Sequence, residues 1–263
     1  MRAHLVQPDI AWEDPRENFQ RVDRLIASAP IEPGDLVVLP EMFAVGFSLN
    51  VDTTAPHAAG TLEYLLDLAD DLGAIVLGGR PVRDCHCSHA TNNLTAAAPG
   101  RRVVCDYKKI HPFSFGKEPE AFTGGDEVTL FDWPIPNSDD ALKVCPAVCY
   151  DLRFPELFRL GMLRGAEVMA IGANWPEPRQ QHWRALAIAR AIENQAFVLA
   201  VNRTGPDPHL NYVGGTIGVS PRGEILGELG GEPGVLSVEI DPAALRAWRG
   251  EFPAWRDARL IQA

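Results

Sequence analysis

Short apolar runs and segments of helical periodicity follow one another along the whole chain. The apolar runs predict strands over residues 3–7, 36–39, 74–78, 93–98, 102–107, 142–148, 168–171, 197–201, 216–220 and 235–240. Apolar residues at helical spacing predict helices over residues 15–29, 61–72, 155–164, 178–195 and 242–248. This order of elements predicts an α/β fold with a mixed sheet system. Periodicity alone does not distinguish two packed sheets from one doubly wound sheet.

The length and composition predict one domain with a large core. The chain has 263 residues, of which 46% are hydrophobic, and no Pro/Gly/Ser-rich stretch marks a linker, so we expect one domain over residues 1–263. The formal charge of −11, with no basic cluster beyond pairs such as Arg101-Arg102, argues against nucleic acid and anionic membranes as partners. No stretch approaches the ~18 apolar residues of a membrane span, and the first residues lack the apolar core of a signal peptide. Five cysteines outside any convincing disulfide framework favour a reducing cytoplasm.

Cys149 stands at the end of a predicted strand and at the start of a turn. The run 142–148 leads to it, and Pro155 suits the first turn of a following helix, where its missing N–H costs little. A thiol at such an elbow is held on a rigid base beside free backbone N–H groups, which is the geometry that nucleophilic attack on a carbonyl needs. Taken alone, the elbow favours catalysis only slightly over a buried cysteine that packs as a small apolar residue.

Two further predicted strands lead to charged residues. The run 36–39 ends at Pro40 and is followed by Glu41, which has apolar neighbours in the sequence. An unpaired carboxylate in apolar surroundings has a raised pKa, which suits a general base near neutral pH. The run 102–107 leads into a loop that holds Lys108, Lys109 and then Glu118. Because strand alternation sends neighbouring side chains to opposite faces, we expect one of the two lysines to be exposed.

Three motifs, in this order, resemble the signatures of the nitrilase, or carbon–nitrogen hydrolase, superfamily. They are Leu-Pro-Glu41-Met-Phe, Tyr-Lys-Lys109-Ile-His and Val-Cys149-Tyr-Asp-Leu-Arg-Phe-Pro-Glu. The similarity covers nearly the whole chain, and Glu-Met-Phe-x-x-Gly-Phe and Asn-Trp-Pro-x-x-Arg are most similar to the ω-amidase-like branch, which hydrolyses the terminal amide of 2-oxo acid amides. The resemblance implies a four-layer α-β-β-α sandwich and association into a homodimer or a higher homo-oligomer through C-terminal surfaces.

The resemblance also implies a role for each residue of these motifs. Cys149 is the expected nucleophile, which forms a thioester as ammonia leaves, and Glu41 is the expected general base. Lys109 and the backbone N–H of Tyr150 would stabilise the oxyanion, and Glu118 would help to position the reactants. In physical terms, a cation beside the thiol favours the thiolate, and a carboxylate beside Lys109 keeps the amine protonated. Since lysine and glutamate supply the charge and proton chemistry of a metal, we expect no cofactor and no metal.

A cysteine- and histidine-rich segment offers an alternative site. Its Cys-x-Cys spacing is tighter than the usual zinc patterns, and no second ligand pair lies nearby, so a hairpin tip is favoured over a zinc site. The four candidate ligands are Cys85, His86, Cys87 and His89.

Other functions remain open at this level. His111 and His182 leave room for a Cys–His hydrolase, which would lose its activity when the histidine is replaced, although a structural histidine is the commoner case. A catalytically silent binding protein of the same fold, and a thiol-redox or metal protein, are alternatives from other classes.

The substrate is less strongly indicated than the chemistry. Aromatic residues in or beside the motifs, among them Phe43, Phe115 and Trp175, are candidate pocket residues, and core packing explains each of them equally well. Arg179 is a candidate partner for a substrate carboxylate, and it is preferred over Arg153, which would pair with Glu156 or Glu193. We therefore predict an amidase that acts on a small linear amide, an ω-amide of a 2-oxo acid such as 2-oxoglutaramate. An N-carbamoyl hydrolase or a nitrilase is the alternative.

Overall fold

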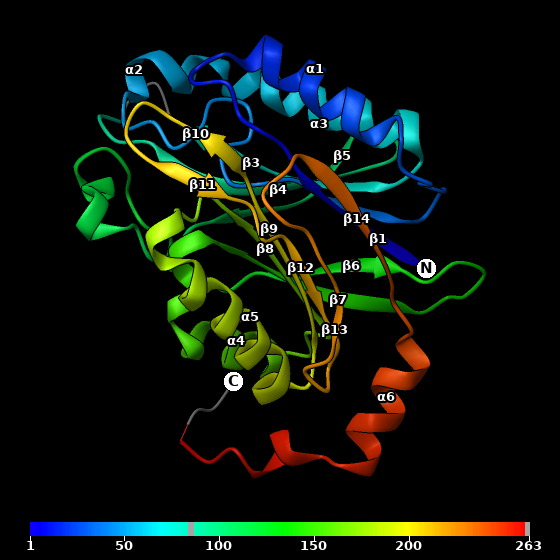
Figure 1. Cartoon of the computed structure of the whole chain (residues 1–263). Helices are drawn as coiled ribbons and strands as arrows, with labels where there is room; N and C mark the ends of the chain where they lie inside the picture. The colour runs from blue at the N-terminus through cyan, green and yellow to red at the C-terminus, as the bar shows by residue number, and fades with distance from the viewer. Residues whose placement is uncertain (84–86, 261–263) are drawn as a thin grey trace.

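Two six-stranded sheets form the centre of the molecule. The computed structural model describes residues 1–83 and 87–260. The first sheet has the order β14-β1-β2-β3-β4-β5 and the second the order β13-β12-β9-β8-β7-β6 (Figure 1). The strands of the first sheet are β1 (Arg2–Gln7), β2 (Leu36–Val38), β3 (Ile75–Val82), β4 (Thr91–Ala98), β5 (Arg102–Lys108) and β14 (Gly234–Glu239). Those of the second are β6 (Phe131–Pro134), β7 (Ala141–Val148), β8 (Val168–Ala173), β9 (Phe197–Asn202), β12 (Ile217–Val219) and β13 (Ile225–Glu228), and a separate hairpin pairs β10 (Thr204–Pro206) with β11 (Asn211–Val213).

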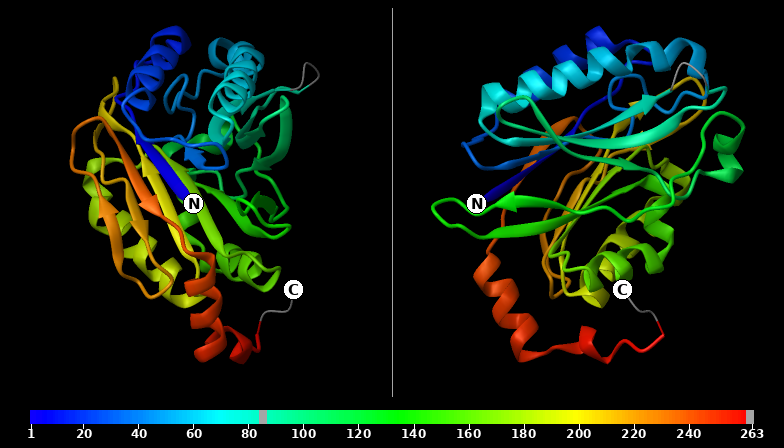
Figure 2. Two further views of the ribbon diagram at one scale, coloured as in Figure 1. Left: turned by 90° about the vertical axis from the view of Figure 1, so that its right-hand side faces the viewer. Right: turned by 180° about the vertical axis from the view of Figure 1, so that it is seen from behind.

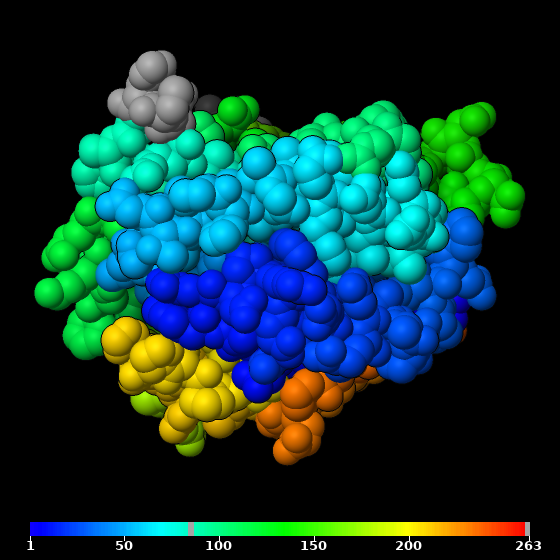
Figure 3. Space-filling model, turned by 90° about the horizontal axis from the view of Figure 1, so that it is seen from above, coloured from blue at the N-terminus to red at the C-terminus, as the bar shows by residue number. Residues whose placement is uncertain are grey.

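Helices cover the outer faces of both sheets. The helices are α1 (Pro15–Ile26), α2 (Val51–Thr54), α3 (Ala58–Leu72), α4 (Pro155–Leu163), α5 (Gln180–Asn194) and α6 (Pro242–Glu251). Figure 2 shows α1 and α3, in blue and cyan, on one outer side of the two sheets, with α4 and α5, in green and yellow, on the other. In the view from above, α1 and α3 cover most of the face (Figure 3). The expected four-layer α-β-β-α sandwich is therefore confirmed, and it resolves the choice that periodicity left open.

The burial of the strands explains their apolar sequences. In β1, Leu5 belongs to the core between the two sheets, whereas the next residue, Val6, packs in a second apolar cluster together with Val22 of α1 and Leu65 of α3. Strands that are covered on both faces read as continuous apolar runs. For the same reason, the sequence pattern located the central strands of both sheets correctly, within a few residues of their ends.

Several short elements were not predicted. They are β6, β10, β11, β13 and α2. β6 and β13 are edge strands, and Ile225 and Leu226 of β13 are exposed, so these strands carry little of the apolar signal that marks a buried strand. In the part of the chain that the structure describes, no helix is both long and apolar enough to cross a bilayer.

The parallel strands at the centre of each sheet place the motifs at one edge. β1, β2 and β3 run parallel in the first sheet, and β7, β8 and β9 run parallel in the second. Glu41 follows β2, Cys149 follows β7, and Asn174 follows β8. In open α/β sheets, ligands bind beyond the carboxyl ends of the strands. The fold therefore brings three separate segments to a common site.

Candidate active site

The backbone at Glu41 passes closely between the two sheets. A Cβ atom on Gly79 of β3 would lie 2.6 Å from the Cα atom of Glu41, and one on Gly172 of β8 would lie 3.0 Å from the Glu41 nitrogen. Only glycine allows so close an approach of one backbone to another. The Pro40 carbonyl accepts a hydrogen bond from the Gly79 nitrogen at 3.1 Å, which fixes the segment against β3. Glu41 is thus held in a dry position between the sheets, with none of its surface exposed.

Lys109 joins the two carboxylates of the motifs. Its Nζ atom donates to Glu41 Oε1 at 2.8 Å and to Glu118 Oε2 at 2.7 Å, and all three side chains are buried. The Nδ2 group of Asn92, on β4, bridges the same two carboxylates, at 2.8 Å from Glu41 and 2.9 Å from Glu118. Lys108, in contrast, is exposed, as strand alternation predicted. One ammonium and one amide therefore hold two buried carboxylates together.

Cys149 lies beside this cluster at a strained turn. It follows β7 directly and begins the 3-10 turn Cys149–Arg153, with a φ of 46°. Positive φ is uncommon for residues other than glycine, and such strain is found most often at functional sites. The Sγ atom donates to the carbonyl of Asn174 at 3.7 Å, while the Asn174 nitrogen donates to Glu41 Oε2 at 2.9 Å. Asn174 thus contacts both the thiol and the carboxylate.

The charges of the cluster set the resting protonation states. Burial alone would raise the pKa of Glu41, but the charge and hydrogen bond of Lys109 bring it below its ordinary value. Burial would lower the pKa of Lys109, and Glu118 and Glu41 raise it instead, which confirms that the carboxylates keep the amine protonated. Burial and the charge of Glu41 raise the pKa of the Cys149 thiol well above its ordinary value, although Lys109 acts in the opposite direction.

One expectation about protonation is therefore wrong. Glu41 does not have the raised pKa of an unpaired carboxylate, because its neighbours in the sequence are apolar whereas its neighbour in space is an ammonium. Lys109 acts on the Cys149 thiol in the expected direction, because it lowers the pKa, but burial and the charges of Glu41 and Glu118 outweigh it, so the thiol stays protonated at rest. The resting site pairs a protonated thiol with an ionised carboxylate. This is the correct starting state for proton transfer during attack.

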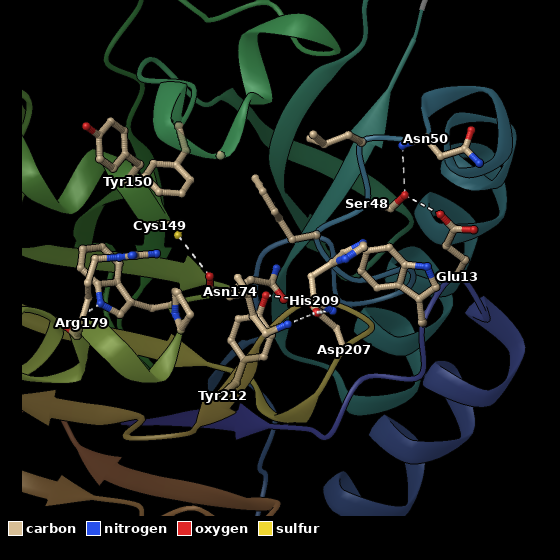
Figure 4. Close-up of a pocket in the computed structure, with 18 of the residues that line it drawn as sticks. Glu13, Ser48, Asn50, Cys149, Tyr150, Asn174, Arg179, Asp207, His209 and Tyr212 are labelled. Atoms are coloured by element: carbon tan, nitrogen blue, oxygen red, sulfur yellow. Dashed lines mark hydrogen bonds between the residues drawn. The ribbon is translucent and has the colours of Figure 1, made fainter.

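A cavity of about 400 Å³ opens in front of Cys149 (Figure 4). Phe47, Phe113, Tyr150 and Trp175 contribute aromatic walls. Lys109 Nζ lies 5.5 Å from the centre of the Phe47 ring, which is part of the cavity wall. A mostly apolar cavity with a few convergent polar groups is the usual form of a small-molecule site.

The structure separates the candidate pocket residues into two groups. Trp175 and Arg179 line the cavity, as does Tyr150. Phe43 does not, because it is fully buried in the apolar layer beneath α1 and α3, where its ring lies 6.0 Å from that of Phe19. Phe115 is 84% exposed and does not belong to the cavity wall either; its neighbour Phe113 takes that place. The proposed substrate contacts of Phe43 and Phe115 are therefore wrong.

Arg153 also differs from expectation. It lines the cavity and stacks over the Trp175 ring at 4.7 Å, whereas Glu193 pairs with Arg190 at 2.8 Å. The preference for Arg179 over Arg153 on the ground of a buried ion pair is therefore wrong. Both guanidinium groups reach the cavity.

The histidines have other partners. His111 Nδ1 donates to Asp151 at 2.8 Å, and the His111 ring stacks on Phe154 at 3.7 Å. His182 Nδ1 lies 3.3 Å from Arg153. Neither ring contacts the Cys149 thiol, so the geometry does not support a Cys–His pair. This contrasts with Glu41, whose negative charge raises the pKa of that thiol.

The cysteine- and histidine-rich segment gives no metal site in the described part of the chain. Cys85 and His86 lie outside the described residues, Cys87 is exposed, and His89 Nδ1 bonds the neighbouring Ser88. Within residues 1–83 and 87–260, no group of three or more cysteine, histidine or acidic side chains is arranged to hold a metal ion.

Sequence reasoning missed the two asparagines that organise the cluster. Asn92 sits in a strand that is buried along almost its whole length, and Asn174 follows an apolar strand directly. A buried polar residue must find hydrogen-bond partners. That requirement is the signal that would have selected both residues, although it would not have named the carboxylates as their partners.

Comparison with known proteins identifies the family. The model of the family described as carbon-nitrogen hydrolase matches residues 2–250. A 2-oxoglutaramate amidase from Bacillus subtilis is 34% identical over 97% of this chain and 96% of its own, and an omega-amidase from Escherichia coli is 32% identical over 98% and 96%. Among solved structures, a CN-hydrolase superfamily protein from Xanthomonas campestris with an arsenic adduct in its active site is 33% identical, with a TM-score of 0.90 over 100% of this chain and 98% of its own.

A second structure bears on the cysteine. An amidase from Nesterenkonia, in which acrylamide has added to the active-site cysteine, is 26% identical, with a TM-score of 0.81 over 97% of this chain and 98% of its own. Family model, sequence relatives and fold agree over nearly the whole chain. The chain belongs to the carbon–nitrogen hydrolase family, within the nitrilase superfamily.

Proposed function

We propose that this carbon–nitrogen hydrolase cleaves the terminal amide of a small linear substrate that also carries a carboxylate, an ω-amide of a 2-oxo acid such as 2-oxoglutaramate. The proposal depends above all on the buried cluster in which Lys109 bonds both Glu41 and Glu118 beside the Cys149 thiol. Relatives of nearly the same length, named 2-oxoglutaramate amidase and omega-amidase, support the choice of substrate.

In the first half of the reaction, Cys149 attacks the amide carbon. Glu41 takes the thiol proton as the carbon–sulfur bond forms, and the developing oxyanion binds the Lys109 ammonium and the backbone N–H of Tyr150. The first N–H groups of a helical turn have no partner within that turn, which supports the role of Tyr150 at the start of the turn Cys149–Arg153. Glu41 then gives its proton to the leaving nitrogen, so that ammonia departs and a thioester remains.

In the second half, water hydrolyses the thioester. Glu41 takes a proton from the water as its oxygen attacks the thioester carbon, and the same two donors stabilise the second oxyanion. The carbon–sulfur bond breaks, the acid leaves, and the proton returns to the sulfur. Glu118 holds the Lys109 ammonium in place at 2.7 Å and keeps it charged throughout.

The polar groups of the cavity suit a substrate that carries a carboxylate. Arg153 and Arg179 both line the cavity and supply guanidinium donors for a carboxylate. The two acidic side chains of the cavity wall are already bonded: Glu13 accepts from Ser48 at 2.5 Å, and Asp207 accepts from the Tyr212 hydroxyl at 2.8 Å. The carboxylate of a 2-oxo acid amide therefore has two cationic partners in the cavity wall.

A substrate panel tests the proposal directly. Ammonia release is measured with 2-oxoglutaramate, glutamine, neutral aliphatic amides, N-carbamoyl compounds and nitriles, with Cys149→Ala as the blank. We expect the highest kcat/KM for 2-oxoglutaramate and release of one ammonia for each acid formed. Ammonia from only nitriles or N-carbamoyl compounds would overturn the substrate class, and full activity of Cys149→Ala would overturn the mechanism.

A cytoplasmic location and a homodimer or higher homo-oligomer complete the proposal. A nucleophilic thiol must stay reduced, which the cytosol provides. The C-terminal segment extends beyond the sandwich (Figure 1) and exposes the apolar side chains of Phe252 and Leu260, which supports association through this end. Light scattering of the purified protein tests the assembly, and a monomer at micromolar concentration would contradict it.

A further inference from the structure

A third buried carboxylate, outside the Glu41–Lys109–Glu118 cluster, gathers four hydrogen bonds. Asp151 is fully buried. Its Oδ2 atom accepts from the Tyr107 hydroxyl at 2.8 Å and from the Val148 nitrogen at 3.0 Å. Its Oδ1 atom accepts from the His111 nitrogen at 3.0 Å and from His111 Nδ1 at 2.8 Å. Every partner is a donor, as an ionised carboxylate requires.

These partners come from the two segments that carry the reacting groups. Tyr107 and His111 flank Lys109 on both sides, at the end of β5 in the first sheet. Val148 immediately precedes Cys149, and Asp151 follows it by two residues, at the end of β7 in the second sheet. One carboxylate therefore joins the loop that holds the ammonium to the turn that holds the sulfur.

No ladder of backbone hydrogen bonds joins these segments, because β5 and β7 belong to different sheets. The stack of the His111 ring on Phe154, with centres 3.7 Å apart and planes 7° apart, strengthens the same junction. The relative position of the two segments thus depends on side-chain contacts, and Asp151 makes three of them, with the Tyr107 hydroxyl and with the backbone and ring nitrogens of His111.

We propose that Asp151 is a positioning residue that sets the separation between the Lys109 ammonium and the Cys149 sulfur. The inference deepens the proposed function, since it assumes that Lys109 stabilises an oxyanion formed by attack of Cys149. A displacement of about 1 Å at a reacting group can cost about 100-fold in rate. An error in this separation would weaken oxyanion stabilisation without removing the nucleophile.

A second buried aspartate provides a matched control. Asp35 accepts from the Arg2 nitrogen at 2.9 Å, from the Glu32 nitrogen at 3.0 Å and from His4 Nε2 at 3.0 Å. Its network resembles that of Asp151, with two backbone donors and a histidine. Asp35 lies just before β2, at the amino end of the strand, whereas Glu41 follows the carboxyl end. Asp35→Asn therefore reports the structural cost of such a change at a distance from the site.

The test compares two reactions of the same sulfur. Amide hydrolysis requires an oxyanion site, whereas alkylation by iodoacetamide forms a carbon–sulfur bond with loss of iodide and a proton, and forms no oxyanion. For Asp151→Asn, whose amide NH₂ would face N–H donors, we expect kcat to fall about 100-fold with KM within about three-fold of wild type. The alkylation rate of Cys149 should stay within about three-fold of wild type. Asp35→Asn should lower the melting temperature and leave both rates of the folded enzyme unchanged.

Tyr107→Phe provides a second variant with a smaller perturbation, in case Asp151→Asn does not fold. It removes one donor to Asp151 and no carbon atoms, and kcat should fall about ten-fold with alkylation unchanged. The inference is overturned if both variants keep kcat within about three-fold of wild type, or if hydrolysis and alkylation fall in parallel. Failure of the proposed function would show in the substrate panel of the wild-type enzyme instead. The variants can then be assayed on whichever substrate the wild-type enzyme hydrolyses.

Discussion

The protonation state of Cys149 follows from all the charges around it rather than from Lys109 alone. Burial and Glu41 raise the pKa of the thiol, with a further contribution from Glu118, whereas Lys109 lowers it. The thiol of the resting enzyme therefore keeps its proton at neutral pH and loses it only above its ordinary titration range. The Glu41 carboxylate, with a lowered pKa, stays ionised below the ordinary range of a carboxylic acid.

Replacement of Glu41 should separate thiolate formation from catalysis. Glu41→Gln removes a charge that raises the thiol pKa and leaves the ammonium of Lys109, so the pKa of Cys149 should fall. Turnover should nevertheless drop about 10²- to 10⁴-fold, because the proton acceptor is lost. Thiolate absorbance as a function of pH, with Cys149→Ala as the blank, measures the first effect, and ammonia release measures the second.

Glu118→Gln is the matched control for this experiment. It removes a charge from the other side of Lys109, so it should also lower the thiol pKa, but it keeps the base and should retain more turnover than Glu41→Gln. A Cys149 thiol that titrates at or above the wild-type pH in Glu41→Gln would contradict the electrostatic account.

The guanidinium group of Arg179 should govern the preference for a carboxylate. Hydrogen bonds to charged groups contribute about 1.5–3 kcal/mol, so Arg179→Met should raise KM for 2-oxoglutaramate about 10- to 100-fold and leave a neutral amide unaffected. Arg184 of α5, which forms a surface ion pair with Glu228 of β13, provides the control. Arg184→Met should leave KM for both substrates unchanged. Equal losses for the anionic and the neutral amide would show that Arg179 does not select the charge.

At the scale of single residues, the sequence identified the reacting groups but not the residues that surround them in space. The three motifs identified Glu41, Lys109 and Cys149, which the fold brings together. The pKa direction of Glu41 was wrong because it depends on a spatial partner, Lys109, that its sequence neighbours do not reveal. Phe43 was wrongly predicted to contact the substrate for a related reason. Some apolar residues beside a motif line the cavity and others pack against the helices, and the sequence does not distinguish the two.

At the scale of elements, the crossing of Glu41 between β3 and β8 depends on two glycines. Gly79→Ala would bring a Cβ atom within 2.6 Å of the Glu41 Cα atom, which is backbone and cannot rotate away. We expect a loss of about 1–3 kcal/mol in the free energy of unfolding, together with a fall in kcat because Glu41 must move. Chemical denaturation and ammonia release measure the two effects.

Gly60→Ala serves as the control for this change. Gly60 lies in α3, and a Cβ atom there would meet nothing within 4 Å. The substitution should stabilise the protein by about 0.5–1 kcal/mol, as expected for alanine in place of glycine within a helix, and leave kcat unchanged. A Gly79→Ala enzyme with wild-type kcat would show that the crossing tolerates displacement of Glu41.

Elements with a strong apolar signal were predicted well, and those without it were missed. β9 is buried on both faces and reads as an apolar run, as does the first half of β3, which is the part that the pattern predicted. β13 has mostly exposed residues, and β6 ends in proline at a sheet edge, so neither differs from a loop by its pattern. The face-to-face packing of the two sheets could not be predicted from periodicity, because each strand pattern fits a doubly wound sheet equally well. It was expected only from the family resemblance.

At the scale of the whole molecule, one core unites the two halves of the site. The core between the sheets includes Leu77 of β3 in the first sheet and Ile171 of β8 in the second. Trp133 of β6 donates from its indole nitrogen to the Gly34 carbonyl, just before β2, at 2.8 Å, and so bridges the two sheets. Glu41 and Lys109 come from the first sheet and Cys149 from the second, so neither sheet holds a complete site by itself.

Activity and tertiary structure should therefore be lost in one transition. In urea, ammonia release, measured rapidly after dilution into substrate at the same urea concentration, should decline with the same midpoint as tryptophan fluorescence, since partial unfolding of either sheet removes part of the site. Trp133→Phe removes the bridging hydrogen bond and leaves a cavity at a fully buried site. It should lower both urea midpoints equally, with a loss of about 1–3 kcal/mol in the free energy of unfolding. Measurements at two protein concentrations separate unfolding from subunit dissociation, because only dissociation shifts with concentration. An activity midpoint well below the fluorescence midpoint at both concentrations would show that the sheets separate before they unfold.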